Sequence, residues 1–223
     1  MVGINLPFTG ADAHDAELIK DRAMLAIDEA NAQGGAAGYK IEVLLLDDGT
    51  AIAGQYDPTQ AGVKLVKQAY DVLPKMIKGG GDGMYGAEIL RGAGFPAAEG
   101  WYATIAAPNI LESPDAAPVI ERFAKKYGQQ PENYSITAYD AALVILDAIK
   151  RVAASGKEVT REAVRDAMQT SHVKTIQGEV AFDDNGDLQN RVISVFQIAK
   201  NDKYPLDEVL HQYKYLGVAP QSS

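Results

Sequence analysis

The chain has 223 residues, of which 47% are hydrophobic and 23% are charged, a composition typical of a globular protein that can bury a sizeable core. Its 21 Lys and Arg residues against 30 Asp and Glu residues give a formal net charge of −9, which disfavours nucleic acid as a partner because most of the surface would repel a phosphate backbone. No apolar run approaches the roughly 18 residues of a membrane span, and the absence of cysteine excludes disulfides, thiolate metal sites and cysteine nucleophiles.

The first half of the chain predicts strands and helices in alternation. Short runs rich in Val, Ile and Leu favour buried strands, whereas apolar residues spaced three or four apart favour helices. In chain order we expect a strand at 2–8, a helix at 16–32, a strand at 41–46, a helix at about 59–70, a strand leading into Gly79, a short helix around 87–91 and a strand at 100–106. This alternation indicates an α/β protein with a parallel sheet and helices on both faces.

The second half is mostly helical and ends in two predicted strands. In chain order we expect helices at 114–127, 134–154 and 160–170, then strands at 178–182 and 191–199. Asn185-Gly186 lies between these two strands, and Asn-Gly is a strong hairpin signal, so we expect a C-terminal antiparallel hairpin. The sequence contains no internal repeat and no linker long enough to separate domains.

A cluster of glycines is the most informative local feature. Met76 to Tyr85 reads MIKGGGDGMY, so Gly79–Gly81 end a probable strand and Asp82 follows at its carboxyl end. In open α/β sheets ligands bind at that end, which makes Asp82 a candidate binding residue. The alternative is a strand-to-loop turn that merely requires glycine. A nucleotide loop is not indicated, because no Gly-Lys-Ser/Thr follows.

The loop at 183–187 resembles the start of a calcium site. Asp183, Asn185 and Asp187 have the spacing of the first calcium ligands, but position six is Leu188 rather than glycine and position twelve is Ser194 rather than glutamate. We therefore reject calcium at this loop.

Two further patterns are weak signals for chemistry. Asp47 and Asp48 follow a predicted strand and could accept a phosphoryl group or bind magnesium, as in a response-regulator receiver, or could simply cap the strand. His14, His172 and His211 share no spacing that would define a metal set or a catalytic triad. We expect no catalytic residue, no metal and no cofactor.

Seven stretches of the sequence resemble, in order, landmarks of the periplasmic solute-binding proteins of ABC importers, in particular the leucine/isoleucine/valine-binding family. They are VGINLPFTGADAHDAELIKDRAMLAIDEANAQGGAAGYKIEVLLLDDG from residue 2, DPTQA from 57, GGGDGMYGAEIL from 79, AAEGWYATIA from 97, RFAKKYGQQPENYSITAYDAALVILDAI from 122, TREAVRDAM from 160 and GEVAFDDNGDLQN from 178. The resemblance implies a type I periplasmic binding protein fold, in which two α/β lobes close on an amino acid or small carboxylate. It implies no enzymatic activity, a periplasmic location and the membrane subunits of an ABC importer as partners.

The resemblance also implies which residues bind the ligand. Asp82 falls where the family places the acidic group that pairs with the ligand's amino group, and Tyr85 lies beside it. Phe8, Thr9 and His14 belong to the loop after the first strand, which in the family contacts the ligand from the other lobe. The structural alternative for these three residues is a turn that contains glycine, followed by an exposed histidine.

The sequence departs from the family after DPTQA. The segment TQAGVKLVKQAYDVLPKMIKGGGDG, from residue 59, resembles the helix and strand that usually close the second lobe. More than a third of a usual family chain is therefore missing, including the loops that bind the ligand carboxylate. Because the strand–helix alternation continues across the join, we expect one flavodoxin-like domain over 1–223. Its parts are a first-lobe-like start at 1–58, a second-lobe-like segment at 59–110, and a helical part with the hairpin at 111–223.

The departure predicts a changed function. Arg22 and Arg91 also stand where the family has small or uncharged residues, so we interpret the chain as an engineered single-lobe or truncated form, with a natural short paralogue or a sequence lacking residues as alternatives. Binding should be weak without the missing loops. The alternatives to a binding module are a scaffold without a ligand and, more distantly, a receiver-like phosphoacceptor domain. The amino terminus has no basic segment followed by an apolar one, so we expect no signal peptide in this chain.

The departure also predicts a homodimer. Removing a segment leaves surfaces that face protein in the family, and the apolar strand at 191–199 could offer its edge to a second chain. The alternative is that this strand folds back on its own sheet and hides its edge.

Overall fold

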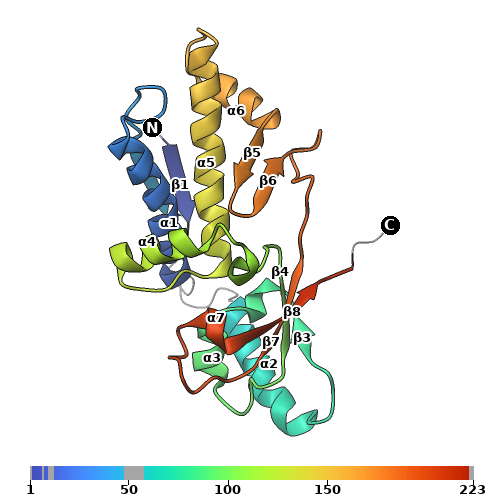
Figure 1. Ribbon diagram of the computed structural model, residues 1–223. Coiled ribbons are helices and arrows are strands. Elements are labelled where there is room, and N and C mark those ends of the chain that lie inside the picture. Colours follow the sequence, from blue (N-terminus) through green and yellow to red (C-terminus); the bar gives the residue numbers. More distant parts are fainter. Residues whose placement is uncertain (1, 7, 10–12, 48–57, 221–223) are drawn as a thin grey trace. The chain divides into compact units, whose positions relative to one another are not determined.

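The computed structural model describes residues 2–6, 8–9, 13–47 and 58–220 (Figure 1). The chain divides into two compact units: unit 1 contains Met1–Ala51 and Ile110–Arg191, and unit 2 contains Ile52–Asn109 and Val192–Ser223. The sequence predicts one domain with three parts, at residues 1–58, 59–110 and 111–223. The chain instead passes from one unit to the other three times, which the order of strands and helices along the sequence does not reveal.

Unit 1 combines helices with two small sheets. Its elements are β1 (Val2–Leu6), α1 (Ala13–Ala32), β2 (Val43–Asp47), the 3-10 turn η2 (Ile110–Glu112), α4 (Ala117–Tyr127), α5 (Asn133–Ala154), α6 (Arg161–Gln169), β5 (His172–Thr175) and β6 (Gly178–Ala181). β1 and β2 pair in parallel, with Val2 opposite Val43, and β5 and β6 pair antiparallel, with His172 opposite Ala181.

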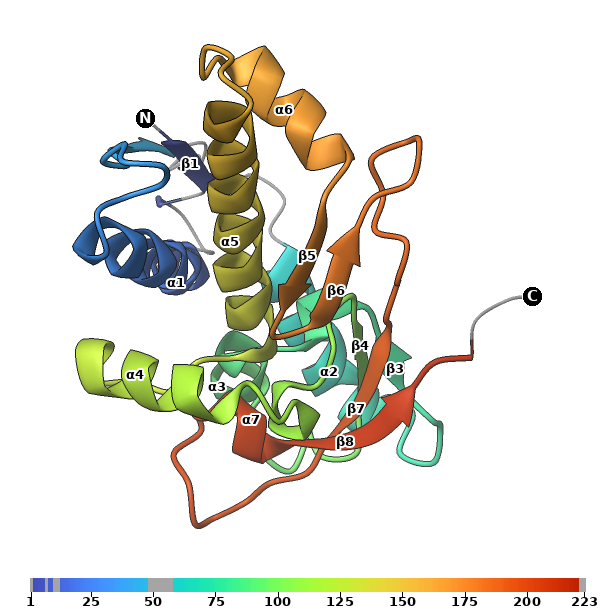
Figure 2. The ribbon, with the colours of Figure 1, turned by 45° about the horizontal axis from the view of Figure 1, so that its top comes forward.

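The core of unit 1 lies where α1 packs along α5 (Figure 2). The buried residues include Ala26 and Ile27 of α1 and Ala142 and Leu146 of α5. α5 begins with a capping box, in which Ser135 Oγ accepts a hydrogen bond from the Glu132 backbone N–H.

Unit 2 is built around a four-stranded sheet. Its elements are α2 (Pro58–Val72), β3 (Gly79–Gly80), the 3-10 turn η1 (Asp82–Met84), α3 (Ala87–Ala93), β4 (Tyr102–Ile105), β7 (Ser194–Ile198), α7 (Val209–Gln212) and β8 (Tyr213–Val218). The strand order is β3-β4-β7-β8, with β3 parallel to β4 and the other pairs antiparallel. Leu90, Phe196 and Ile198 are almost fully buried and form the centre of this unit.

The α/β class, the parallel strand pairs and an antiparallel pair at the C-terminal end are confirmed, but two details of the sequence prediction are wrong. The described strands form three sheets rather than one. The predicted hairpin of 178–182 with 191–199 does not form, because β6 pairs with β5 and β7 pairs with β4 and β8. The antiparallel pair near the C-terminus is therefore β7 with β8.

The second correction also bears on the predicted dimer. β7 lies between β4 and β8, so both of its edges are paired within unit 2. The segment 191–199 therefore cannot offer a free edge to a second chain. Over the described part of the chain, no helix is both long and apolar enough to cross a membrane.

Candidate functional site

The glycine cluster forms β3 and the start of the turn that follows it. A Cβ atom at Gly79 would lie 3.2 Å from the Cβ of Tyr102, and one at Gly80 would lie 2.6 Å from the Cγ of Met84. These two glycines therefore allow β4 and the turn to approach β3 closely. A Cβ at Gly81 or Gly83 would meet no atom within 4 Å, so close approach does not explain these two.

Asp82 is exposed and begins η1 directly after the turn residue Gly81. Its Oδ1 accepts a hydrogen bond of 2.9 Å from the Gly83 backbone N–H, and its carbonyl oxygen accepts one of 2.8 Å from the Tyr85 N–H. The bond from Gly83 orients the carboxylate, the bond from Tyr85 closes the turn, and the residue is exposed to solvent. A carboxylate held in this way can pair with a cationic group such as an ammonium.

Tyr85 lies beside Asp82 in the sequence, but its side chain belongs to the core of unit 2. The residue is only 8% exposed, and its ring centroid lies 5.0 Å from that of Phe196 and 4.5 Å from that of Tyr213. This packing anchors the turn on β7 and β8. A ligand contact by Tyr85 stays a prediction.

Tyr213 contacts the end of the Asp82 turn, and the sequence analysis did not identify it. Its hydroxyl accepts a hydrogen bond of 3.1 Å from the Gly86 N–H and donates one of 2.8 Å to the Met84 carbonyl oxygen. It lies 127 residues from Gly86 along the chain. No local pattern links such distant residues, because the contact arises only when β8 completes the sheet.

The other predicted site residues belong to unit 1. Phe8 and Thr9 follow β1, Phe8 half-buried and Thr9 exposed, and the Phe8 N–H donates a hydrogen bond of 2.9 Å to the Leu6 carbonyl oxygen. His14 is in the first turn of α1, and its side chain lies outside what the structure describes. That these residues and Asp82 face one cleft stays a prediction.

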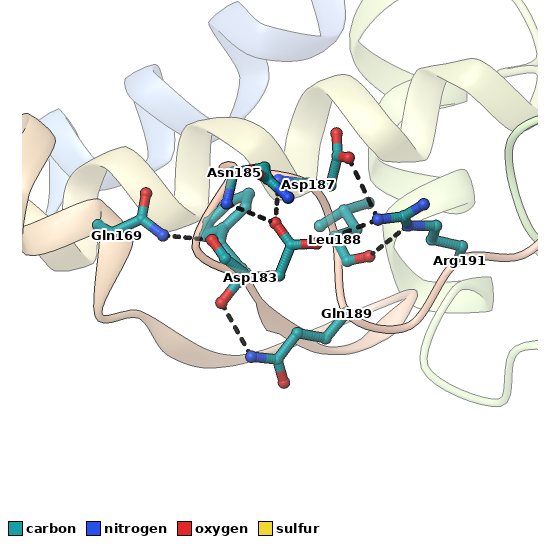
Figure 3. Close-up of polar contacts among 8 residues, drawn as sticks. Gln169, Asp183, Asn185, Asp187, Leu188, Gln189 and Arg191 are labelled. Atoms are coloured by element: carbon teal, nitrogen blue, oxygen red, sulfur yellow. Dashed lines mark hydrogen bonds and ion pairs between the residues drawn. The ribbon is translucent and has the colours of Figure 1, made fainter.

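The structure describes the loop at 183–187 in full but only part of the Asp47-Asp48 motif. Asp47 is the last residue of β2, and Asp48 lies outside the described residues. In the loop at 183–187, the Asp183 carboxylate accepts hydrogen bonds from the backbone N–H groups of Asp187 and Asn185, and Arg191 forms ion pairs of 3.1 Å with both Asp183 and Asp187 (Figure 3). The two backbone bonds, together with Arg191, lower the pKa of Asp183.

In a calcium loop the bound ion neutralises the carboxylates. Here the Arg191 guanidinium pairs with both carboxylates and supplies the positive charge instead. Gln169 also donates to the backbone carbonyl oxygen of Asp183 in this loop, and Gln189 donates to that of Phe182 just before it (Figure 3). No group of three or more His, Cys, Asp or Glu residues that could hold a metal occurs in the part of the chain that the structure describes.

The two unusual arginines have partners within their own units. Arg22 of α1 is 3% exposed, and its guanidinium carbon lies 4.9 Å from the ring centroid of Phe123 of α4. Arg91 of α3 forms ion pairs of 2.6 Å with both Glu88 and Asp207. Both arginines therefore join elements of the fold.

Comparisons with known proteins agree with this architecture. The family profile described as "Periplasmic binding protein" matches residues 52–203. The Leu/Ile/Val-binding protein homolog 2 of Brucella abortus (strain 2308) is 30% identical over 128 residues, which cover 57% of this chain and 33% of that protein. The match thus spans about a third of the length of this curated relative.

Solved structures share the fold at low sequence identity. A branched-chain amino acid transporter substrate binding protein from Streptococcus pneumoniae, in complex with isoleucine, matches with a TM-score of 0.75 and 14% identity over 97% of this chain and 99% of that chain. An ABC transporter solute binding protein from R. palustris, in complex with benzoate, matches with a TM-score of 0.63 and 12% identity over 97% and 95% of the two chains.

Proposed function

Because this chain belongs to the periplasmic binding protein family, we propose that it is a non-catalytic binding module for an amino acid or a small carboxylate. The observation that carries the proposal is the exposed Asp82 carboxylate, held on an ordered turn at the end of β3. The names of its relatives support the same ligand class, since one is a Leu/Ile/Val-binding protein homolog and two matching structures hold isoleucine and benzoate. The module would work in the periplasm with the membrane subunits of an ABC importer.

In the proposed complex the Asp82 carboxylate accepts charge-assisted hydrogen bonds from the ligand's ammonium group. The family resemblance also makes Tyr85, Phe8, Thr9 and His14 candidates for contact with the ligand. Such a site binds and releases its ligand without a covalent step, so no catalytic residue is required.

Binding by this chain should be weak. The resemblance supports this, since the segment after DPTQA matches the end of the second lobe and the loops that bind the ligand carboxylate in the family have no counterpart. An engineered or truncated scaffold without a ligand is the second candidate. It is favoured by the packing of Tyr85 into the core of unit 2, which leaves fewer side chains for a ligand.

Calorimetric titration with leucine, valine and phenylalanine distinguishes these candidates. We expect dissociation constants of about 0.1–10 mM for at least one amino acid, a loss of binding in Asp82→Asn, and no change in Asp71→Asn, an exposed aspartate on α2 of the same unit. Submicromolar binding would contradict the weakened site. Binding that Asp82→Asn leaves intact would contradict the role of Asp82, and no binding at all would favour the scaffold.

The receiver-like alternative has a separate test. Incubation with acetyl phosphate and magnesium should leave the mass of the protein unchanged. A gain of one phosphoryl group that Asp47→Asn abolishes would support the phosphoacceptor function instead.

The predicted homodimer requires a different edge from the one expected. β3 and β8 are the outer strands of the four-stranded sheet, and Leu216 and Val218 of β8 are exposed. We propose that β8 provides the contact between two copies. Light scattering over a concentration series tests this, since a mass that stays at 23.9 kDa would refute the dimer.

A further inference from the structure

We propose that Tyr213 is a positioning residue that holds the Asp82 turn in the form that binds a ligand. This inference rests on the proposed function in one respect, namely that Asp82 is the carboxylate that receives the ligand's ammonium. It adds Tyr213 of β8 to the residues that the sequence proposes for the site, none of which lies on that strand.

The Tyr213 hydroxyl forms hydrogen bonds to backbone groups at the end of the Asp82 turn. It bonds to the Gly86 N–H at 3.1 Å and to the Met84 carbonyl oxygen at 2.8 Å, and it lies 3.3 Å from the Gly86 carbonyl oxygen. Met84 is also the last residue of η1, which Asp82 begins. One side-chain hydroxyl therefore ties together both backbone groups where the chain leaves the Asp82 turn and enters α3.

The Tyr213 ring supports the same segment. It packs 4.5 Å from the ring of Tyr85, which in turn packs 5.0 Å from the ring of Phe196 on β7. Tyr213 is only 3% exposed, so both its ring and its hydroxyl act inside unit 2 rather than in solvent. The turn is therefore held by the tilted packing of the Tyr85 ring against Tyr213 and Phe196, and by the hydrogen bonds of the Tyr213 hydroxyl.

The structural reason for using tyrosine follows from these contacts. Gly86 and Met84 are buried, and a buried backbone N–H or C=O without a partner is destabilising. Phenylalanine at position 213 would keep the ring contact with Tyr85 but would remove the hydroxyl that bonds to both backbone groups. The turn would then gain conformations in which the backbone groups reach water and the Asp82 carboxylate loses its fixed direction.

Two readouts test the inference with Tyr213→Phe in the full chain. The first is amide hydrogen exchange, in which we expect the Gly86 N–H to exchange about tenfold faster while the β7 amides keep their rates. The second compares leucine with its 2-oxo analogue, which lacks the ammonium. We expect the preference for leucine over the analogue to fall at least about threefold, since only leucine depends on the direction of Asp82.

Tyr215→Phe is the matched control, because it makes the same chemical change two residues along β8 and its ring also packs on Phe196. It should change neither readout. Unchanged exchange at Gly86 in Tyr213→Phe would overturn the inference, as would faster exchange throughout β7 or an unchanged preference for leucine. If the parent chain binds neither compound, the proposed function fails, and the exchange rate of Gly86 still decides whether Tyr213 orders the turn.

Discussion

A single tyrosine joins three helices of unit 1. The Tyr139 hydroxyl, on α5, donates a hydrogen bond of 2.8 Å to Glu29 Oε2 on α1 and lies 3.5 Å from an Nη atom of Arg122 on α4. Arg122 also forms an ion pair of 2.7 Å with Glu29. Burial, together with the hydrogen bond to the Glu29 carboxylate, raises the pKa of Tyr139 to about 12.

We predict that this tyrosine makes the stability of unit 1 fall at alkaline pH. The native pKa of about 12 lies above the value of about 10 for an unfolded tyrosine, so the native state holds its proton more tightly. The stabilisation is fully present below about pH 10 and is lost as the pH rises from about 10 to 12. Urea unfolding at several pH values should show this loss in the parent chain and a smaller loss in Tyr139→Phe.

Tyr39→Phe is the control for this experiment, because Tyr39 belongs to the same unit and is 53% exposed. It should leave the alkaline loss of stability unchanged. An equal loss in the parent chain and in Tyr139→Phe would show that other groups cause it.

The residue scale also shows what the sequence could reveal about the site. Asp82 is found from the sequence because glycines and a strand mark its position locally, and the structure places it exposed after β3 as expected. Tyr213 and the burial of Tyr85 depend on β8, a strand that the sequence did not indicate. Local signals identify the turn, whereas distant strand pairing determines what holds it.

At the scale of elements, the β5–β6 hairpin depends on one carboxylate of α5. Asp140 is 1% exposed and accepts hydrogen bonds of 3.2 and 2.9 Å from the Ile176 and Gln177 N–H groups in the turn of that hairpin. Burial raises the pKa of Asp140 in spite of these bonds. The carboxylate therefore connects α5 to the turn of this hairpin.

We predict that Asp140→Ala lowers the free energy of unfolding by about 1–3 kcal/mol, because two backbone donors lose their partner. Asp140→Asn keeps one acceptor oxygen and should cost less. Chemical denaturation measures both variants. A loss of less than about 0.5 kcal/mol in Asp140→Ala would show that the hydrogen bonds of Asp140 to the hairpin do not stabilise the fold.

The contact between α2 and α3 depends on a glycine. A Cβ at Gly92 would lie 2.6 Å from Cγ2 of Val63, a branched side chain that cannot easily turn away. A Cβ at Gly62 would lie 3.2 Å from Cδ1 of Ile89 and 3.3 Å from Sδ of Met84, the flexible ends of two side chains.

We predict opposite effects of alanine at these two helical positions. Alanine favours helix by about 1 kcal/mol over glycine, but overpacking at Gly92 should cost about 1–3 kcal/mol, so Gly92→Ala should destabilise unit 2. Gly62→Ala should be neutral or stabilising. Thermal unfolding compares them, and a stabilising Gly92→Ala would show that α2 and α3 move apart easily.

Strand pairing was the least predictable part of the fold. The predicted turn at Asn185-Gly186 does form, with the Gly186 N–H bonded to the Asp183 carbonyl oxygen. β6 nevertheless pairs with β5 through the short turn between Thr175 and Gly178, which the sequence did not mark. The bounds of α1 to α6 were predicted to within a few residues because apolar spacing is a local property, whereas the short helix α7 was not predicted. The pairing of a strand depends on segments that are distant in the sequence.

At the scale of the whole molecule, the chain forms two cores, one in each unit. It passes from one unit to the other three times. α1 and α5 build the core of unit 1, while the sheet around β7 and the helices α2 and α3 build that of unit 2. Residues close in the sequence, such as Asn109 and Ile110, belong to different units. The resemblance identified the correct family. The single sheet that we expected does not form, because the described strands belong to three sheets.

Two separate cores predict unfolding in more than one step. Each core can be lost while the other keeps its buried contacts, so the chain should depart from a two-state transition. Hydrogen exchange in increasing denaturant should therefore divide the amides into two groups that match units 1 and 2. Asp140→Ala should lower the protection of unit 1 alone, Gly92→Ala that of unit 2 alone, and the double variant should show the sum of both effects, because the two sites share no partner. If either substitution lowers the protection of both units equally, the chain unfolds as one cooperative body and the two cores depend on each other for stability.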